Sequence, residues 1–320
     1  MEVDVEKRFL AFACLPTLLL VFGCKVPLGA GWTTLGGPGS GSGIYQFHTP
    51  TGIRLDDLGR IYVADQNNNR IERMDNMNGA NWTALGTPPS GQSGNGQFWL
   101  PTGITLDANG LIYVADQFNG RITRMSDMSG TGWTAWGSWP AYQPTGVALD
   151  SSGRIYVTDY LNNRIARIDN MSGANPTTLP LVGTSSGSGI GQFNQATTTV
   201  VDASGHIYVA DFSNNRIVRM DDMTGTNWTT LGGPGSGAGT GQFNTPAGIA
   251  LDEHGRIYVA DSGNNRIVRM DSMSGANWVT FGTLGSGDDQ FNSPAAVLVF
   301  SGWTYVADSG NNRIARFVIP

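Results

Sequence analysis

One short sequence recurs six times along the chain, and this repetition constrains the fold more than any other feature. The first copy reads Ile61-Tyr-Val-Ala-Asp65, and in every copy an arginine follows the aspartate five residues later. Successive copies lie 43 to 52 residues apart, which is longer than the period of most helical repeats. The recurring pairs are Asp65 and Arg70, Asp116 and Arg121, Asp159 and Arg164, Asp211 and Arg216, Asp261 and Arg266, and Asp308 and Arg313.

Each repeat unit has the pattern of four antiparallel strands. In one unit, Gly248–Asp252 and Arg256–Ala260 are apolar runs separated by a hairpin-type turn. Two further runs, Arg266–Met270 and Asn277–Phe281, follow turns rich in Asn, Asp and Gly. A four-stranded sheet of this kind exposes two apolar faces that only neighbouring units can bury. The sequence therefore predicts an all-β fold, a six-bladed β-propeller with four antiparallel strands per blade.

The two ends of the repeat region predict how the ring closes. Gly31-Trp-Thr-Thr-Leu35 has the sequence of a fourth strand, like Asn227-Trp-Thr-Thr-Leu231, whereas the chain stops after a third strand, Arg313–Phe317. The last blade therefore lacks its own outer strand, and the first segment supplies one. This 3+1 pairing also removes the exposed sheet edges of an open array.

The N-terminal segment has the features of an export signal. An apolar run, residues 9–23, follows Lys7-Arg8 and is short for a membrane span. It ends in Val21-Phe22-Gly23-Cys24, which resembles a bacterial lipoprotein lipobox. We expect a signal peptide over 1–23, a lipid on Cys24, a linker over 24–30 and the propeller over 31–320. This predicts an exported lipoprotein of the bacterial cell envelope, held at the outer membrane or surface; the alternatives are a plain secretory signal and an uncleaved anchor.

Charge and composition bear on the partners. The net charge is −6 and the pI about 5.0, without a cluster of Lys and Arg, so we expect no nucleic-acid partner. The chain has 45 glycines and 14% charged residues, and the glycines fall in turn-like contexts. Both properties are typical of many short strands.

The repeated motifs resemble the NHL repeat. They read Pro-x-Gly-Ile-x-Leu-Asp, then Gly-Arg-Ile-Tyr-Val-Ala-Asp, then Asn-Asn-Arg-Ile-x-Arg-Met-Asp, and the resemblance extends from about Gly31 to the C-terminus. It implies a six-bladed propeller. NHL-like propellers serve as protein- or RNA-binding modules and extracellular sensor domains, and relatives such as the peptidylglycine amidating lyases are metal-dependent enzymes. The family alone does not choose among these functions.

Residue types weigh against an enzyme without excluding one. A zinc site would need several imidazoles, but the chain has only His48, His206 and His254, and we expect His48 at the opposite end of the blades from the other two. We predict no cofactor and no metal ligand set, although a calcium site built from carboxylates and amides stays open. Because the abundant Asp and Arg residues are periodic, we assign them to structure: the Asp accepts turn N–H groups and the Arg pairs with a carboxylate.

Functional residues are expected where the repeats differ from one another. The connection into the third blade is shortened and carries Trp136, Trp139 and Tyr142, and the second blade is preceded by Trp99. Arg54 replaces a small or apolar residue in the first blade, as Glu72 does on its third strand. The prediction is a binding or scaffold propeller that engages a protein, peptide or glycan through its loop face. One alternative is that the aromatics only fill a gap; the other is a metal-dependent enzyme of lyase or lactonase type. The candidate ligand-binding residues are Trp99, Trp136, Trp139, Tyr142, Arg54 and His48.

Overall fold

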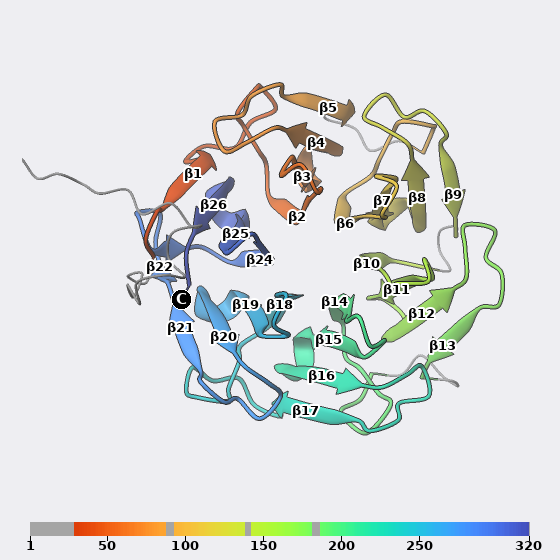
Figure 1. The fold of residues 1–320 in the computed structure, drawn as a ribbon, viewed down its shortest axis with the longest axis vertical. Coiled ribbons are helices and arrows are strands. Elements are labelled where there is room, and N and C mark those ends of the chain that lie inside the picture. Colours follow the sequence, from red (N-terminus) through yellow and green to blue (C-terminus); the bar gives the residue numbers. More distant parts are fainter. Residues whose placement is uncertain (1–28, 88–92, 138–141, 181–185, 320) are drawn as a thin grey trace, which may run out of the picture.

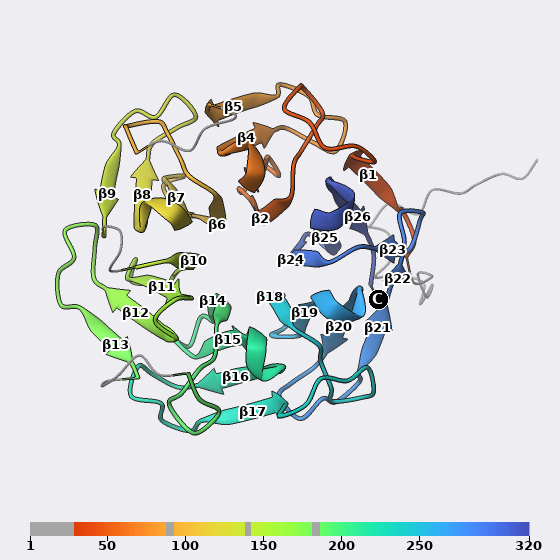
Figure 2. The ribbon, with the colours of Figure 1, turned by 180° about the vertical axis from the view of Figure 1, so that it is seen from behind.

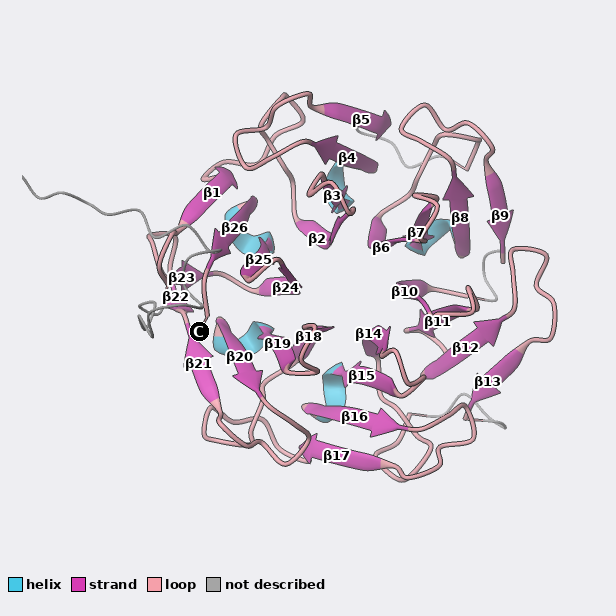
Figure 3. Cartoon of the chain, in the orientation of Figure 1, coloured by secondary structure: helices cyan, strands magenta, loops and turns pink. Residues whose placement is uncertain are grey.

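The computed structural model describes residues 29–87, 93–137, 142–180 and 186–319. Within these ranges the chain forms six four-stranded antiparallel sheets set radially around a central channel, seen from both sides in Figures 1 and 2. This confirms the predicted six-bladed propeller. The only helices in the described ranges are short 3₁₀ turns (Figure 3), and none has the length and apolar character needed to cross a bilayer. The predictions for the signal sequence, Cys24 and Trp139 concern residues outside the described ranges.

In blades 1 to 5 the strands follow chain order from the innermost strand outward, and in blade 6 the N-terminal strand β1 is the outermost. Blade 1 contains β2 (Pro50–Leu55), β3 (Ile61–Asp65), β4 (Arg70–Met74) and β5 (Thr83–Gly86); blade 2 contains β6 (Pro101–Leu106), β7 (Ile112–Asp116), β8 (Arg121–Met125) and β9 (Thr134–Trp136); blade 3 contains β10 (Pro144–Leu149), β11 (Ile155–Asp159), β12 (Arg164–Ile168) and β13 (Thr177–Leu179). Blade 4 contains β14 (Ala196–Val201), β15 (Ile207–Asp211), β16 (Arg216–Met220) and β17 (Thr229–Gly232); blade 5 contains β18 (Pro246–Leu251), β19 (Ile257–Asp261), β20 (Arg266–Met270) and β21 (Val279–Phe281); blade 6 contains β24 (Pro294–Phe300), β25 (Trp303–Asp308), β26 (Arg313–Phe317) and β1 (Thr33–Gly36). A short parallel pair, β22 (Thr283–Leu284) and β23 (Gln290–Phe291), lies outside the blades.

Turns of 3₁₀ helix join the second and third strands in five blades. They are η2 (Gln66–Asn68), η3 (Gln117–Asn119), η4 (Phe212–Asn214), η5 (Ser262–Asn264) and η6 (Ser309–Asn311). Each ends at a residue with left-handed backbone, Asn in four blades and Gly120 in blade 2, because these residues tolerate a positive φ.

The second strand of each blade is the centre of its core. All five residues of β3 are buried, and Val63 and Ala64 have no exposed surface. Both faces of this strand are covered because each blade packs between two others, which explains the nearly continuous apolar sequence. Complete burial of an Ile or Val side chain contributes about 1.5–3 kcal/mol.

The innermost strands approach one another closely around the channel. A Cβ on Gly52 would lie 2.2 Å from the carbonyl oxygen of Thr102 in the next blade, so the Pro-x-Gly motif requires glycine there. The hydroxyl of Thr51 donates to the same carbonyl at 3.3 Å. Threonines at this position in blades 2, 3 and 4 also donate to backbone carbonyls of the following blade: Thr102 to Pro144, Thr145 to Ala196 and Thr197 to Ala247.

The first described strand closes the ring. β1 pairs antiparallel with β26, with Leu35 opposite Ile314, and the ring of Trp32 stacks on Phe317 with centroids 5.1 Å apart. This confirms the predicted 3+1 closure, in which the N-terminal segment completes blade 6.

Deleting residues 31–35 should therefore destabilise the whole propeller. Blade 6 would lose its outer strand and the stacked Trp32, and the loss should be at least about 3 kcal/mol, the usual scale for removal of a packed Trp. Chemical denaturation measures it. Thr34→Ala, at an exposed position of the same strand, is the control. Equal stability of the deletion variant and the wild type would contradict the closure scheme.

Candidate binding face and central channel

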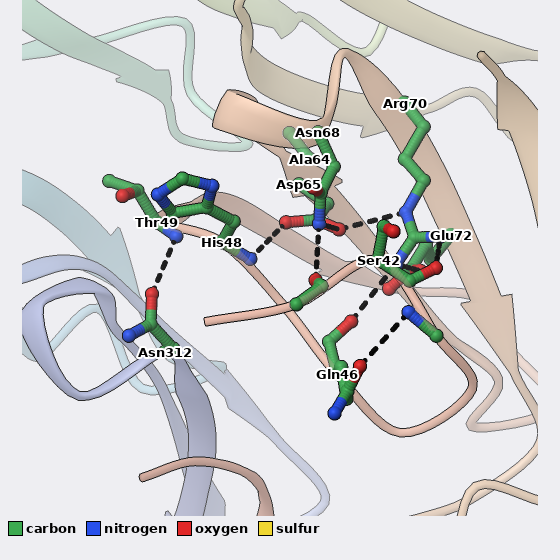
Figure 4. Close-up of polar contacts among 12 residues, drawn as sticks. Ser42, Gln46, His48, Thr49, Ala64, Asp65, Asn68, Arg70, Glu72 and Asn312 are labelled. Carbon is green, nitrogen blue, oxygen red and sulfur yellow. Dashed lines mark hydrogen bonds and ion pairs between the residues drawn. The ribbon is translucent and has the colours of Figure 1, made fainter. Parts of the chain in front are cut away.

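The repeated aspartate joins three parts of its blade. In blade 1, Asp65 Oδ1 accepts the backbone N–H of His48 at 2.6 Å, and Oδ2 accepts Asn68 Nδ2 at 2.7 Å and Arg70 Nε at 2.8 Å (Figure 4). Asp65 is fully buried. In all six blades the Oδ1 contact is 2.6–3.0 Å and the arginine contact 2.7–2.9 Å. The carboxylate thus fixes the start of the first strand, the turn and the third strand together.

The repeated arginine holds the connection that leads into its blade. Arg70 Nη1 and Nη2 donate to the carbonyls of Ser42 and Gln46 at 2.6 and 2.9 Å. Arg121, Arg216, Arg266 and Arg313 make the corresponding contacts. With a carboxylate and two carbonyls bound, the guanidinium has little capacity left for a ligand.

The asparagine that ends each turn connects neighbouring blades. Asn69 Oδ1 accepts the N–H of Leu100 in blade 2 at 2.9 Å, and Asn312 of blade 6 accepts the N–H of Thr49 in blade 1 at the same distance (Figure 4). Asn163, Asn215 and Asn265 bond to the next blade likewise. Blade 2 is the exception: it has Gly120 in this position, and glycine has no side chain to make this contact.

Glu72 adds a second carboxyl to the blade 1 cluster. It is fully buried, and its carboxyl group contacts the guanidinium of Arg70. Burial and the charge of Asp65 raise the pKa of Glu72 to about 9, while Arg70 acts in the opposite direction. Burial also raises the pKa of Asp65, against the lowering effect of its hydrogen-bond donors. With Glu72 protonated near neutral pH, one carboxylate and one guanidinium remain, and the buried cluster has no net charge.

The central channel contains a cavity of about 650 Å³. Its walls are the six innermost strands, and its mouth is formed by the residue that follows the repeated aspartate: Gln66, Gln117, Tyr160, Phe212 and Ser262. Gln66 Nε2 of blade 1 donates to Gln117 Oε1 of the neighbouring blade 2 at 3.4 Å. These mouth residues therefore lie at the end of the channel where the turns between the second and third strands are found.

Arg54 is the one charged residue among the described residues that line the cavity. It lies on β2, inside the channel, whereas the aromatic residues of the loop face lie beyond the other end of that strand. Its side chain is exposed to the channel. The surrounding walls desolvate the guanidinium and lower its pKa, and the charge of Asp57 acts in the opposite direction.

The loop face around the mouth differs between its two halves. The turns and the connections into the first strands share this face, because Phe118 N–H donates to the carbonyl of Trp99 at 3.0 Å and the other five blades have the same bond. At the connection residue bonded to the repeated aspartate, and at the two turn residues that follow this aspartate, blades 2 to 4 carry several large side chains, whereas blades 5 and 6 carry only Ser, Gly and Asn. The large residues are Trp99, Phe118, Tyr160, Leu161 and Phe212.

Trp99 is the candidate residue that protrudes most from this face. Its side chain is 45% exposed, and its ring centroid lies 5.7 Å from that of Phe118. His48 occupies the equivalent position in blade 1, since the backbone N–H of each residue donates to the repeated aspartate of its blade.

Trp136 and Tyr142 pack between blades 2 and 3. In the other blades a wedge Phe contacts a Trp that precedes the outer strand, as Phe98 contacts Trp133 at 5.4 Å. Blade 3 has Pro176 in place of that Trp, and Trp136 from blade 2 contacts Tyr142 instead, at 5.0 Å. Arg164 lies over the Tyr142 ring at 4.9 Å. These contacts favour the gap-filling interpretation for this pair.

The three histidines lie in separate places. His206 Nδ1 is 2.8 Å from Asp202 and its Nε2 is 3.7 Å from Asp221, at the end of blade 4 away from the loop face. His254 is an exposed turn residue of blade 5, and His48 lies on the loop face. Among the described residues, no three His, Cys, Asp or Glu side chains are grouped as a metal site.

The mouth residues and Phe118 were not among the candidates from sequence. The signal was available: the position after the repeated aspartate reads Gln, Gln, Tyr, Phe, Ser and Ser along the chain, between neighbours that scarcely change. The sequence does not show in which direction the side chain of this residue points. In the closed ring this residue lines the channel at its mouth.

The fold and site together define a six-bladed β-propeller with an asymmetric loop face above a central channel. The sequence profile of the NHL repeat matches residues 47–73, 142–168, 193–220 and 243–270. The chain is therefore an NHL-repeat propeller.

Known proteins resemble parts of this sequence or share its fold. NHL repeat-containing protein 3 of Mus musculus is 32% identical over 108 residues, 32% of this chain and 29% of that protein, so the chain spans less than a third of that relative. An auxiliary nutrient binding protein of Bacteroides thetaiotaomicron superposes with a TM-score of 0.62 at 15% identity, covering 84% of this chain and 69% of that one. A catalytically inactive virginiamycin B lyase of Staphylococcus aureus with quinupristin gives 0.59 at 17% identity, covering 90% and 89%. At these identities the two structures show the fold alone.

Proposed function

We propose that this chain is a binding propeller that engages a protein, peptide or glycan through the loop face of blades 2 to 4. One observation carries the proposal: the aromatic residues gather on one half of that face, while the same positions in blades 5 and 6 are Ser, Gly and Asn. A structural role for these positions would be shared by all blades, because all blades meet the same packing requirements. The difference between the halves therefore indicates a ligand.

The chemistry of this face suits such a ligand. Trp99 and Phe118 present rigid rings that give large contact area at small entropic cost, as aromatic anchors do in interfaces. Their backbone is held by the buried Asp116 through the Trp99 N–H, so the face is preorganised. The nutrient-binding protein from Bacteroides thetaiotaomicron supports the use of this fold for binding. The enzyme alternative rests on similarity of fold to the lyase.

Replacing Trp99 by Ala should weaken ligand binding by about 2 kcal/mol or more, the scale for an aromatic anchor, with little effect on stability. Arrays of oligosaccharides and peptides identify the ligand of the full chain, and titration of the best binder measures the loss. Trp136→Ala is the matched comparison: as a packing residue it should reduce stability by about 3 kcal/mol and leave affinity intact. A Trp99→Ala variant that melts early but binds normally would defeat the proposal.

We propose further that the propeller is exported and anchored in the membrane by a lipid on Cys24. The apolar run before Gly23-Cys24 supports this, as does the resemblance of that junction to a lipobox. Replacing Cys24 by Ala should move the protein from the membrane to the soluble or precursor fraction, because the acyl anchor is then missing. Fractionation with an immunoblot measures it, with Cys14→Ala as control. A cleaved Cys24→Ala variant that remains in the membrane would refute the anchor.

A further inference from the structure

We propose that the central channel below the loop face binds the carboxylate of a ligand with an apolar body, and that Arg54 is the residue that recognises it. This inference rests on the proposed binding function and names the chemistry of one part of the ligand. It is argued from the partners of Arg54, the walls at its level and the dimensions of the channel.

Arg54 differs from the six repeated arginines in lacking a carboxylate partner. The repeated arginines each contact their aspartate at 2.7–2.9 Å. Arg54 forms no ion pair or hydrogen bond with any residue in the described part of the chain; Asp57 influences it only through its charge. An arginine stays protonated in proteins, and the exposed guanidinium of Arg54 is open to an anion in the channel. The position is thus suited to an anion that comes from outside.

The fold does not need an arginine at this position. Arg54 lies opposite the tyrosine of the second strand, Tyr62, and this register identifies its counterparts in the other blades. They are Thr105, Ala148, Val200, Ala250 and Leu298. Because small and apolar residues serve equally well in five blades, Arg54 has a role outside the architecture.

The counterparts of Arg54 in the other blades indicate what the rest of the ligand is like. At the level of Arg54 the neighbouring innermost strand supplies one hydroxyl, Thr105, and the other four blades supply Ala, Val, Ala and Leu. Higher in the channel, four threonines already donate their hydroxyls to backbone carbonyls. The channel thus offers one cation and few free donors, which disfavours a sugar and favours an anionic group on an apolar body.

The channel is long and wide enough for such a ligand. Arg54 lies four residues along β2 from Pro50, or about 13 Å below the mouth at the rise of a strand. The 650 Å³ cavity is continuous from the mouth residues Tyr160 and Phe212 to Arg54. A planar guanidinium binds a carboxylate through two parallel hydrogen bonds, which explains the use of Arg here.

Ligand-observed NMR titration of the full chain tests the proposal with two pairs of probes. Hexanoate is compared with hexanamide, and a peptide with an apolar C-terminal residue and free carboxylate is compared with its amidated form. We expect each acid to bind at least about tenfold more tightly than its neutral counterpart, since a hydrogen bond to a charged group has that effect. Arg54→Ala, which copies blades 3 and 5, should abolish the difference. Arg154→Ala, at the half-exposed partner of Asp150, changes the net charge equally and should preserve it.

The outcomes distinguish a free organic acid from a peptide terminus as the ligand, and they distinguish the channel proposal from the loop-face proposal. Binding of hexanoate identifies a free organic acid as sufficient, and binding of the free-acid peptide alone identifies a chain terminus; both support the channel site when Arg54→Ala removes them. Equal binding by Arg54→Ala and wild type, or no preference for either acid, overturns it. The loop-face proposal fails separately, if Trp99→Ala leaves the array ligand bound, and that result does not alter hexanoate binding.

Discussion

The structure depends on a carboxylate buried in every blade. Asp65 and its five equivalents each accept a backbone N–H from the connection, an amide from the turn and the Nε of an arginine. A buried carboxylate is tolerable only when its oxygens are bound and its charge is paired, and this geometry meets both conditions. Because the same arginine holds the incoming connection by its carbonyls, one ion pair fixes the loop face relative to the strands.

This arrangement separates the positions that build the ring from those that are free to vary. Asp, Arg and the turn-ending Asn are committed to contacts within or between blades. Two positions in each blade have a fixed backbone and a side chain that can vary. One is the residue that follows the repeated Asp, and the other is the connection residue whose N–H donates to that Asp. Trp99, Tyr160 and Phe212 occupy such positions, as does Ser262. The propeller can therefore change its ligand without changing its frame.

Local patterns predicted most of the fold. The six copies of Ile-Tyr-Val-Ala-Asp indicate buried strands, and Gly31–Leu35 resembles an outer strand clearly enough to predict closure, which the pairing of β1 with β26 confirms. Contacts that arise where one blade lacks a repeated residue could not be predicted in the same way. Trp136 compensates for Pro176 across a blade boundary, and this partnership depends on where two loops meet in space.

The candidate site was predicted only in part, because the sequence does not show in which direction a side chain points. Sequence shows that Arg54 and Trp99 are specific to their blades, but it does not show that Arg54 lies inside the channel while Trp99 lies on the rim. The mouth residues Gln117, Tyr160 and Phe212 were not predicted, because a single repeat does not show that the residue after the aspartate lines the channel. Side-chain direction at a propeller mouth is set by the closed ring, which no single repeat contains.

The claim that a buried ion pair in each blade supports the ring is tested most directly by the free energy of unfolding of Asp261→Asn. This change keeps the shape of the side chain and leaves Arg266 buried without its carboxylate, so the account predicts a loss of about 3 kcal/mol or more by chemical denaturation. Asp271→Asn, at an ion pair on the surface of the same blade, should have little effect. Equal stability of the two variants would contradict the account.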